Sequence, residues 1–492
     1  MATSSKSNSF KPWNPASSPI EPDSLQGLIF ALEGTEGLTV LLNGPTGCKY
    51  YHGAISEGQT VRDRDFDPLS LPMNWYFGQA RVPCTYLDNG DYVYGSERKL
   101  IEALEYFRDA PETGMLCIVN SPGASLIGDD LRSIAQRTLG DRPFVTVETP
   151  GFSLDWCQGH ELGARVLVEQ LALSGDKARA QSQAPEQGRG QEQEQEQVPA
   201  RAAEQVPARA TEQVQTNVSA RSQAPESPNP KPRVNILGLS LFHRYHTGDV
   251  EAIRQLVESC GFSVGCMLCA SGSVQEMGEI GKADLNVVVH PELGLATARL
   301  LEERFGTPYY VCDGPPVGFD AAEQVGRDLA KAAGGDASAL LRESRRARRR
   351  AFSSISHLNS ITGLPKGVTY AVEGTYSQLY SYVKFLAEYF AMVPVALVPS
   401  CPQSDVWRGK LEGLLETYGC QDALSNDPVA AAPELAFGSA TLITRLKLAN
   451  IEFSGVETML PTLGYIDVVP KTHLGTQGAL LLVESVLNGL LF

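Results

Sequence analysis

The chain has 492 residues, ten cysteines and a formal net charge of −16 at pH 7, and 42% of its residues are hydrophobic. The length favours two to four domains, and the acidic balance argues against a general nucleic-acid-binding protein, because neutralising phosphates needs a basic surface. No apolar run approaches the roughly 18 residues that suggest a membrane span, and the cysteines are too sparse for a disulfide scaffold.

Two segments have compositions unlike that of a folded domain. Residues 1–24 are polar and contain no apolar h-region, so we expect a polar tail rather than a secretory signal, and a cytoplasmic protein. Residues 175–232 are rich in Gln, Glu, Ala, Pro and Arg and repeat the string EQVPARA. Such a segment has too few large apolar groups to offset its ordering entropy, so we predict a disordered insertion in a surface loop.

The rest of the chain alternates apolar strand-like runs with helix-length segments. The predicted strands are 38–44, 115–123, 144–151, 233–240, 262–270, 283–291, 368–374 and 393–400, and the helices between or after them include 96–110, 249–261, 293–306, 376–391 and 478–491. Buried runs ending in Gly, Pro or Asn with helices between them are typical of doubly wound parallel sheets. The pattern predicts three α/β domains, over 25–174, 233–365 and 366–492. The basic cluster at 342–350 falls in a helix-like pattern and is interpreted as a solvated helix face.

Loops that contain residues with reactive or metal-binding side chains follow several of the predicted strands. Ligands bind outside the carboxyl ends of the strands in open α/β sheets. Cys48 lies in the turn NGPTGCKYYHG, directly after the first strand, and Cys84 lies in the loop RVPCTYLDNG. A thiolate in either loop is a candidate metal ligand.

Seven of the other eight cysteines divide into two groups. Cys117 lies in an apolar strand, where a buried structural thiol is expected, and the same interpretation suits Cys157, Cys260, Cys401 and Cys420. Cys266 and Cys269 form a Cys-x-x-Cys pair at a strand end without a second pair to complete a zinc site, so they are pocket-lining, redox-active or inert.

Histidines at two predicted loop positions are candidates for function. His290 ends the run NVVVHP and His473 lies in PKTHLGTQG, whereas His357 lies in a polar helix and is expected to be solvated. No Ser-His-Asp or Cys-His pair can be assigned from spacing. Neither a Walker loop nor a complete GxGxxG follows the first strand, so binding of ATP or a dinucleotide in the usual way is not expected.

Five stretches resemble segments of one family and follow one another along the chain in the order that the family has. NGPTGCKYYHG resembles the Gly-Pro-x-Gly-Cys loop of the nitrogenase component 1 superfamily, and VNSPGASLIGDDLRSI is similar to its Ile-Gly-Asp-Asp loop. DYVYGSERKLIEAL, ADLNVVVHP and THLGTQGALLLVESVLN are similar to further segments of that superfamily. The resemblance implies three Rossmann-like doubly wound parallel-sheet domains, an iron–sulfur cluster at a subunit interface, and electrons delivered by a separate ATP-dependent iron protein.

This sequence departs from the family pattern at three places. No cysteine precedes Cys48, the Ser121-Pro122 region replaces a cluster cysteine, and Pro291 stands where the family has a cofactor-ligating cysteine after the histidine. An eight-iron cluster and dinitrogen reduction are therefore not expected. A two-fold dimer would instead bring four thiolates together, which is the number that a [4Fe–4S] cluster needs.

The resulting hypothesis is a homodimer, or a dimer with a related chain, that holds one [4Fe–4S] cluster through Cys48 and Cys84 and reduces a small-molecule substrate with electrons from the iron protein. The candidate catalytic residues are His52, His290 and His473, and the candidate substrate-binding residues are Lys49, Arg81, Cys266 and Cys269. Two alternatives stay open, namely a non-catalytic scaffold for metallocluster or tetrapyrrole assembly, and a metal-free α/β binding protein.

Overall fold

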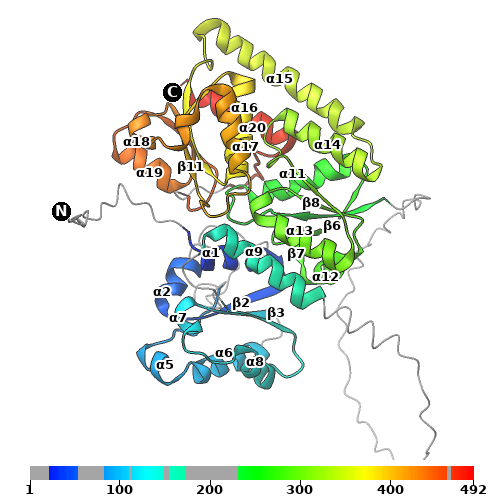
Figure 1. Ribbon diagram of the computed structural model, residues 1–492, viewed down its shortest axis with the longest axis vertical. Coiled ribbons are helices and arrows are strands. Elements are labelled where there is room, and N and C mark those ends of the chain that lie inside the picture. Colours follow the sequence, from blue (N-terminus) through cyan, green and yellow to red (C-terminus); the bar gives the residue numbers. More distant parts are fainter. Residues whose placement is uncertain are drawn as a thin grey trace, which may run out of the picture.

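A computed structural model describes residues 22–53, 82–109, 114–148, 154–172, 231–462 and 467–491. Apart from their last few residues, the predicted polar tail and disordered insertion lie outside these ranges. The chain forms three α/β units, and each contains one parallel sheet (Figure 1). None of the described helices has both the length and the apolar character needed to cross a membrane.

The first unit, residues 22–172, is built around a three-stranded parallel sheet in the order β2-β3-β4. Its strands are β1 (Thr35–Glu36), β2 (Leu38–Asn43), β3 (Met115–Asn120) and β4 (Phe144–Val147). Its helices are α1 (Ser24–Glu33), α2 (Thr46–Cys48), the π-helical turn η1 (Lys49–Gly53), α5 (Asn89–Tyr94), α6 (Glu97–Asp109), α7 (Pro122–Ser125), α8 (Leu131–Leu139), α9 (Trp156–Leu167) and the π-helical turn η3 (Val168–Ala172). Strands β2 and β3 are almost wholly buried, as expected for parallel strands covered on both faces, whereas alternate residues of β4 are only partly buried.

The second unit, residues 231–362, contains a four-stranded parallel sheet in the order β6-β5-β8-β9. Its strands are β5 (Arg233–Leu237), β6 (Ser263–Met267), β7 (Gly272–Ser273), β8 (Leu285–Val288) and β9 (Tyr309–Val311). Its helices are α11 (His246–Ser259), α12 (Val274–Met277), the 3-10 turn η4 (Ile280–Lys282), α13 (Pro291–Phe305), α14 (Phe319–Ala333) and α15 (Ser338–Thr362). The predicted basic helix is confirmed, because most arginines of 342–350 are solvent-exposed on α15.

The third unit, residues 368–491, contains a four-stranded parallel sheet in the order β11-β10-β12-β13. Its strands are β10 (Thr369–Gly374), β11 (Val393–Pro399), β12 (Leu435–Gly438) and β13 (Ser454–Glu457). Its helices are α16 (Tyr376–Phe390), α17 (Arg408–Tyr418), the 3-10 turn η5 (Gln421–Leu424), α18 (Pro428–Ala431), α19 (Ala440–Leu448) and α20 (Gly475–Gly489). The predicted fold class, three Rossmann-like parallel-sheet units, is confirmed.

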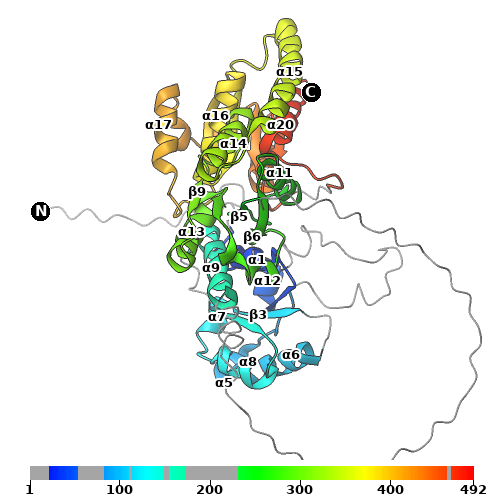
Figure 2. The ribbon, with the colours of Figure 1, turned by 90° about the vertical axis from the view of Figure 1, so that its right-hand side faces the viewer.

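All three units are joined through shared apolar clusters. The second and third units share one continuous apolar core, and α20 lies beside α14 and α15 of the second unit (Figure 2). The first unit contacts the second through α9 on α13, and through a short parallel pairing of Thr35 and Glu36 in β1 with Gly272 and Ser273 in β7. The second unit is therefore the common support for the other two.

Candidate functional site

The loops carrying Cys48 and Cys84 meet at the carboxyl end of β2. The chain around residue 84 runs beside β2, since Leu42 N donates to Pro83 O at 2.8 Å and Thr85 N donates to Leu42 O at 3.1 Å. The Cys84 thiol then donates to Gly44 O at 3.1 Å, in the turn that leads into α2 and Cys48. Two cysteines separated by the undescribed residues 54–81 are thus brought to one strand end.

Ser121, at the end of β3, lies against the same turn. A side-chain carbon added to Gly44 would lie 2.7 Å from Ser121 Oγ and 3.7 Å from the Cys48 Cβ, so only glycine fits there without a shift. Tyr92 of α5 reaches this group as well, because its hydroxyl would lie 3.1 Å from a carbon added to Gly123. Ser121 therefore lies beside the turn that carries Cys48, and Tyr92 lies beside the start of α7.

Both thiols are partly withdrawn from water. Burial raises the pKa of Cys48, and the hydrogen bond with Ser121 only partly opposes that rise. Burial also raises the pKa of Cys84, and the nearby Cys48 adds to the effect while the Lys49 ammonium counteracts it. In the free protein both groups are neutral thiols near pH 7, and a bound metal would be needed to ionise them.

His52 is held rigidly beside this loop. Its Nε2 lies 2.9 Å from Asp23 Oδ2 and its Nδ1 lies 3.0 Å from Cys48 O, so both ring nitrogens have partners. Burial acts to raise the pKa of Asp23, but hydrogen bonds from His52 and from backbone amides lower it overall. Lys49 is buried at the start of η1. Arg81, a predicted substrate-binding residue, lies outside the described residues.

Large apolar side chains are exposed around the thiol loops. This aromatic patch comprises Tyr50, Tyr51, Tyr86, Tyr92, Val93, Tyr94 and Leu126. Tyr50 and Tyr51 lie in η1, directly after α2, and Leu126 directly follows α7; the labels α2, α5 and α7 lie along one side of the first unit (Figure 1). Tyr94 and Leu126 are the most exposed of these side chains, at 90% and 88%.

His290 and His473 lie together at a second place, between the second and third units. They line a small cavity of about 20 Å³ with His243, Tyr245, Asp249 and Tyr382. His290 lies between β8 and α13 and directly precedes that helix. His473 lies shortly before the first residue of α20. The structure thus brings His290 and His473 together. The third predicted histidine, His52, lies instead beside Cys48 in the first unit.

The histidines of this region are neutral. Burial lowers the pKa of His473 to about 3 and that of His243 to about 4, and it lowers the pKa of His290 well below its ordinary value. Tyr382 hydroxyl and His473 Nδ1 are 2.6 Å apart, and the rings of His243 and His290 stack at 4.3 Å.

Several ring nitrogens of the region have no hydrogen-bond partner among the described residues, namely Nδ1 of His290, Nε2 of His473 and His243, and both nitrogens of His160. Such buried polar atoms are costly unless a ligand or water satisfies them. Neutral imidazoles can bind a metal or hydrogen-bond an organic ligand.

Three polar residues of this region were not singled out by the sequence reasoning. His243 follows strand β5, so the strand-end rule applied to the first and second units could have found it. His160 lies inside helix α9, and Asp249 lies inside α11, where no local signal marks them. Burial raises the pKa of Asp249 to about 7, although Thr472 donates a hydrogen bond to its carboxylate.

Cys266 and Cys269 lie apart from the histidine cavity. Both are free thiols with no exposed surface, packed in the core between α1 of the first unit and β6 of the second. Burial raises the pKa of Cys266 to about 12 and that of Cys269 further. Their role in binding substrate stays a prediction, and a bound molecule would reach them only if neighbouring side chains moved.

The interpretation of Cys157 and Cys401 as simple buried thiols is wrong in one respect. Both are fully buried, but the structure joins them in a disulfide across 244 residues of sequence. Cys157 lies on α9 of the first unit and Cys401 follows β11 of the third. Their pairing depends on how the units dock, which no local pattern in the sequence reveals.

A family profile described as "Nitrogenase component 1 type Oxidoreductase" matches residues 25–491. The chain belongs to the nitrogenase component 1 type oxidoreductase family. Among solved structures, "Nitrogenase Cp1 at pH 6.5" matches with a TM-score of 0.69 at 14% identity, over 98% of this chain and 94% of that one. At this identity the likeness concerns the fold alone.

Curated relatives of this nitrogenase component 1 type chain include subunits B of light-independent protochlorophyllide reductase. The subunit from Nephroselmis olivacea is 22% identical over 60% of this chain and 44% of its own length. The subunit from Rhodospirillum rubrum is 34% identical over 25% of this chain and 22% of its own length. The matches thus span less than half the length of these relatives.

Proposed function

We propose that this chain is the electron-accepting, substrate-reducing component of a nitrogenase-like oxidoreductase. In this proposal a separate ATP-dependent iron protein delivers electrons to a [4Fe–4S] cluster, and the substrate is a small molecule other than dinitrogen. The observation that carries the proposal is the convergence of Cys48 and Cys84 at the end of β2. Membership of the family supports the reaction class.

The residues of the thiol loops fit half of a cluster site. One chain offers two thiols, and a [4Fe–4S] cluster needs four, so a second copy or a related chain would complete the set. The aromatic patch around the loops supports such an interface, because exposed apolar side chains gather there. A bound cluster would supply a one-electron carrier, while Lys49 would offset negative charge beside Cys84.

The cavity between the second and third units is the proposed substrate side; its volume of about 20 Å³ fits about one water molecule, so a larger substrate would enter only if the lining side chains moved. Its imidazoles His290 and His473 are neutral, so they would orient a ligand through hydrogen bonds rather than by charge. Asp249, with a pKa of about 7, is the cavity group best matched to transferring protons near neutral pH. His52 would position the thiol loop through its contacts with Asp23 and with Cys48 O.

The first test is the iron and acid-labile sulfide content of protein purified without oxygen, with its mass in solution. We expect about two irons and two sulfides per chain in a dimer, as one shared [4Fe–4S] cluster requires. The Cys48→Ser variant should lose this iron. Cys420→Ser is the matched control, because Cys420 is a half-buried free thiol of the third unit.

A second measurement separates an enzyme from an assembly scaffold. With an iron protein and ATP, the enzyme should show reduction of its cluster, followed by turnover of a substrate. A scaffold would instead retain a metallocluster or tetrapyrrole without turnover. Absence of iron from anaerobic protein would contradict the enzyme and the metallocluster scaffold, and would leave a tetrapyrrole scaffold or a metal-free binding protein.

A further inference from the structure

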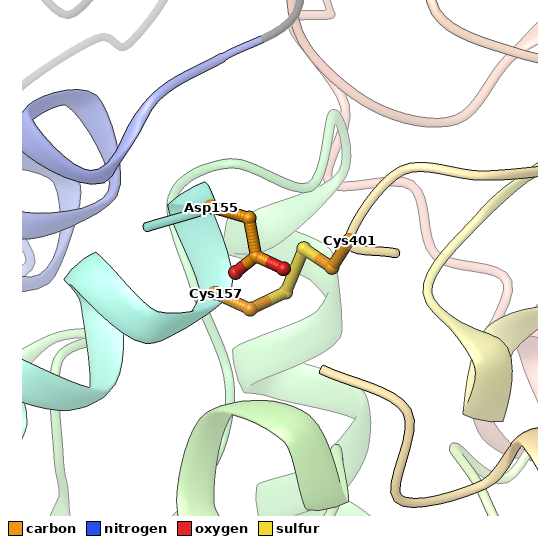
Figure 3. Close-up of side chains that lie close together, drawn as sticks. All are labelled: Asp155, Cys157 and Cys401. Atoms are coloured by element: carbon orange, nitrogen blue, oxygen red, sulfur yellow. A yellow bond between two sulfur atoms is a disulfide. The ribbon is translucent and has the colours of Figure 1, made fainter. Parts of the chain in front are cut away.

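The disulfide between Cys157 and Cys401 lies at the contact of the first and third units. Cys157 is in the first turn of α9, and Cys401 lies in the loop that follows β11 (Figure 3). Both sulfurs are buried in an apolar cluster that includes Trp156, Phe242 and Met459. The linkage is therefore an internal crosslink between units and not an exposed surface feature.

A carboxylate lies directly beside the two sulfurs. Figure 3 shows the oxygens of Asp155 next to the bond between Cys157 and Cys401, and one donor atom of each residue lies within 4.8 Å of the others. Hydrogen bonds fix this carboxylate from both units: Gln158 N and Ser404 Oγ donate to Oδ1 at 3.0 and 3.2 Å, and Gln403 N donates to Oδ2 at 3.2 Å.

Capping of α9 accounts for only part of this arrangement. The bond from Gln158 N is the usual helix N-cap contact. However, Asp155 is only 8% exposed, and the hydrogen-bond donors given above for its carboxylate are two backbone amides and a serine hydroxyl, all of them neutral groups. A buried carboxylate held by neutral donors beside two cysteine sulfurs is a donor set suited to a thiophilic divalent ion.

We propose that Cys157, Cys401 and Asp155 bind a divalent cation of the zinc class when the disulfide is reduced. A dithiol reductant would break the S–S bond, become a disulfide itself, and pass two electrons and two protons to the cysteines. The cation would then displace those two protons and form two metal–sulfur bonds and one metal–oxygen bond. The same three residues would thus crosslink the first and third units in either redox state.

Cobalt(II) is a suitable probe, because its bonds to thiolates give a charge-transfer absorption. The full chain would carry Cys48→Ser and Cys84→Ser in every sample, so that the thiol loops bind no metal. We expect the protein reduced with a phosphine, which is itself oxidised to its oxide, to bind one cobalt per chain with this absorption. The oxidised protein should bind none at this site.

Three substitutions in that background locate the site. Cys401→Ser should abolish the charge-transfer absorption, and Asp155→Asn should weaken cobalt binding by at least roughly tenfold, the lower bound for losing even an outer-shell partner. Cys420→Ser should leave binding unchanged. The proposal is overturned if the reduced protein binds no cobalt, if the oxidised protein binds equally well, or if binding survives Cys401→Ser. Unchanged affinity in Asp155→Asn would overturn the assignment of the carboxylate.

Discussion

At the scale of single residues, Asp249 couples the stability of the protein to pH. Burial raises its pKa from 3.8 to about 7, so the folded state holds a proton that the unfolded chain releases between these values. Asp249 therefore favours the folded state below about pH 4, compared with higher pH. This contribution to the free energy of unfolding is lost as the pH rises to about 7.

The Asp249→Asn substitution should remove this pH dependence. The amide is neutral and can still accept the hydrogen bond from Thr472. Relative to the parent, the variant should gain stability as the pH rises from 4 to 7, by at most roughly 4 kcal/mol. Urea unfolding at several pH values measures this difference. Glu251→Gln, an exposed site on the same helix, is the control, and parallel pH profiles for Asp249→Asn and the parent would contradict the prediction.

At the scale of elements, α1 and α9 touch through their backbones. A side-chain carbon added to Gly27 would lie 1.8 Å from Trp156 O, and one added to Gly159 would lie 1.9 Å from Ser24 O. Glycine at both positions lets the helices approach closely. This contact sets the position of Trp156 and Cys157, which begin α9.

Gly159→Ala should therefore destabilise the first unit. The added methyl group forces the backbones apart, and we expect a loss of roughly 1–3 kcal/mol or more in the free energy of unfolding. Gly413→Ala on α17 is the matched control, because nothing lies within 4 Å of the added carbon. That control should be stabilised by about 0.5–1 kcal/mol. Equal effects of the two substitutions in thermal or urea unfolding would refute the account of the helix contact.

At the scale of the whole molecule, the aromatic patch is the proposed surface for a second chain. Replacing Tyr50 and Tyr94, which are 71% and 90% exposed, by glutamate should leave the fold intact and shift the protein from dimer to monomer. Sedimentation analysis measures the mass. Tyr106→Glu on α6 is the control, because Tyr106 is 59% exposed but is not part of the patch. A dimer that survives both patch substitutions would argue against this surface.

The sequence predicts more of the fold than of the sites. Buried parallel strands leave continuous apolar runs, so β2, β3 and β8 were recognisable from residue order alone. Cys48 and His290 could also be predicted as candidate site residues, because each lies at or just after the end of a predicted strand. By contrast, the disulfide partner of Cys157 and the neighbours of His160 come from other units of the chain. Such pairings depend on docking between units, for which a single sequence carries no periodic signal.

The pairing of β1 with β7 limits how this protein can be divided for study. Thr35 and Glu36 belong to the first unit in sequence, yet their backbone partners are Gly272 and Ser273. A fragment that ends before the second unit would leave this strand edge open and able to pair with other chains. Expression fragments should therefore keep the second unit attached to whichever neighbour is under investigation.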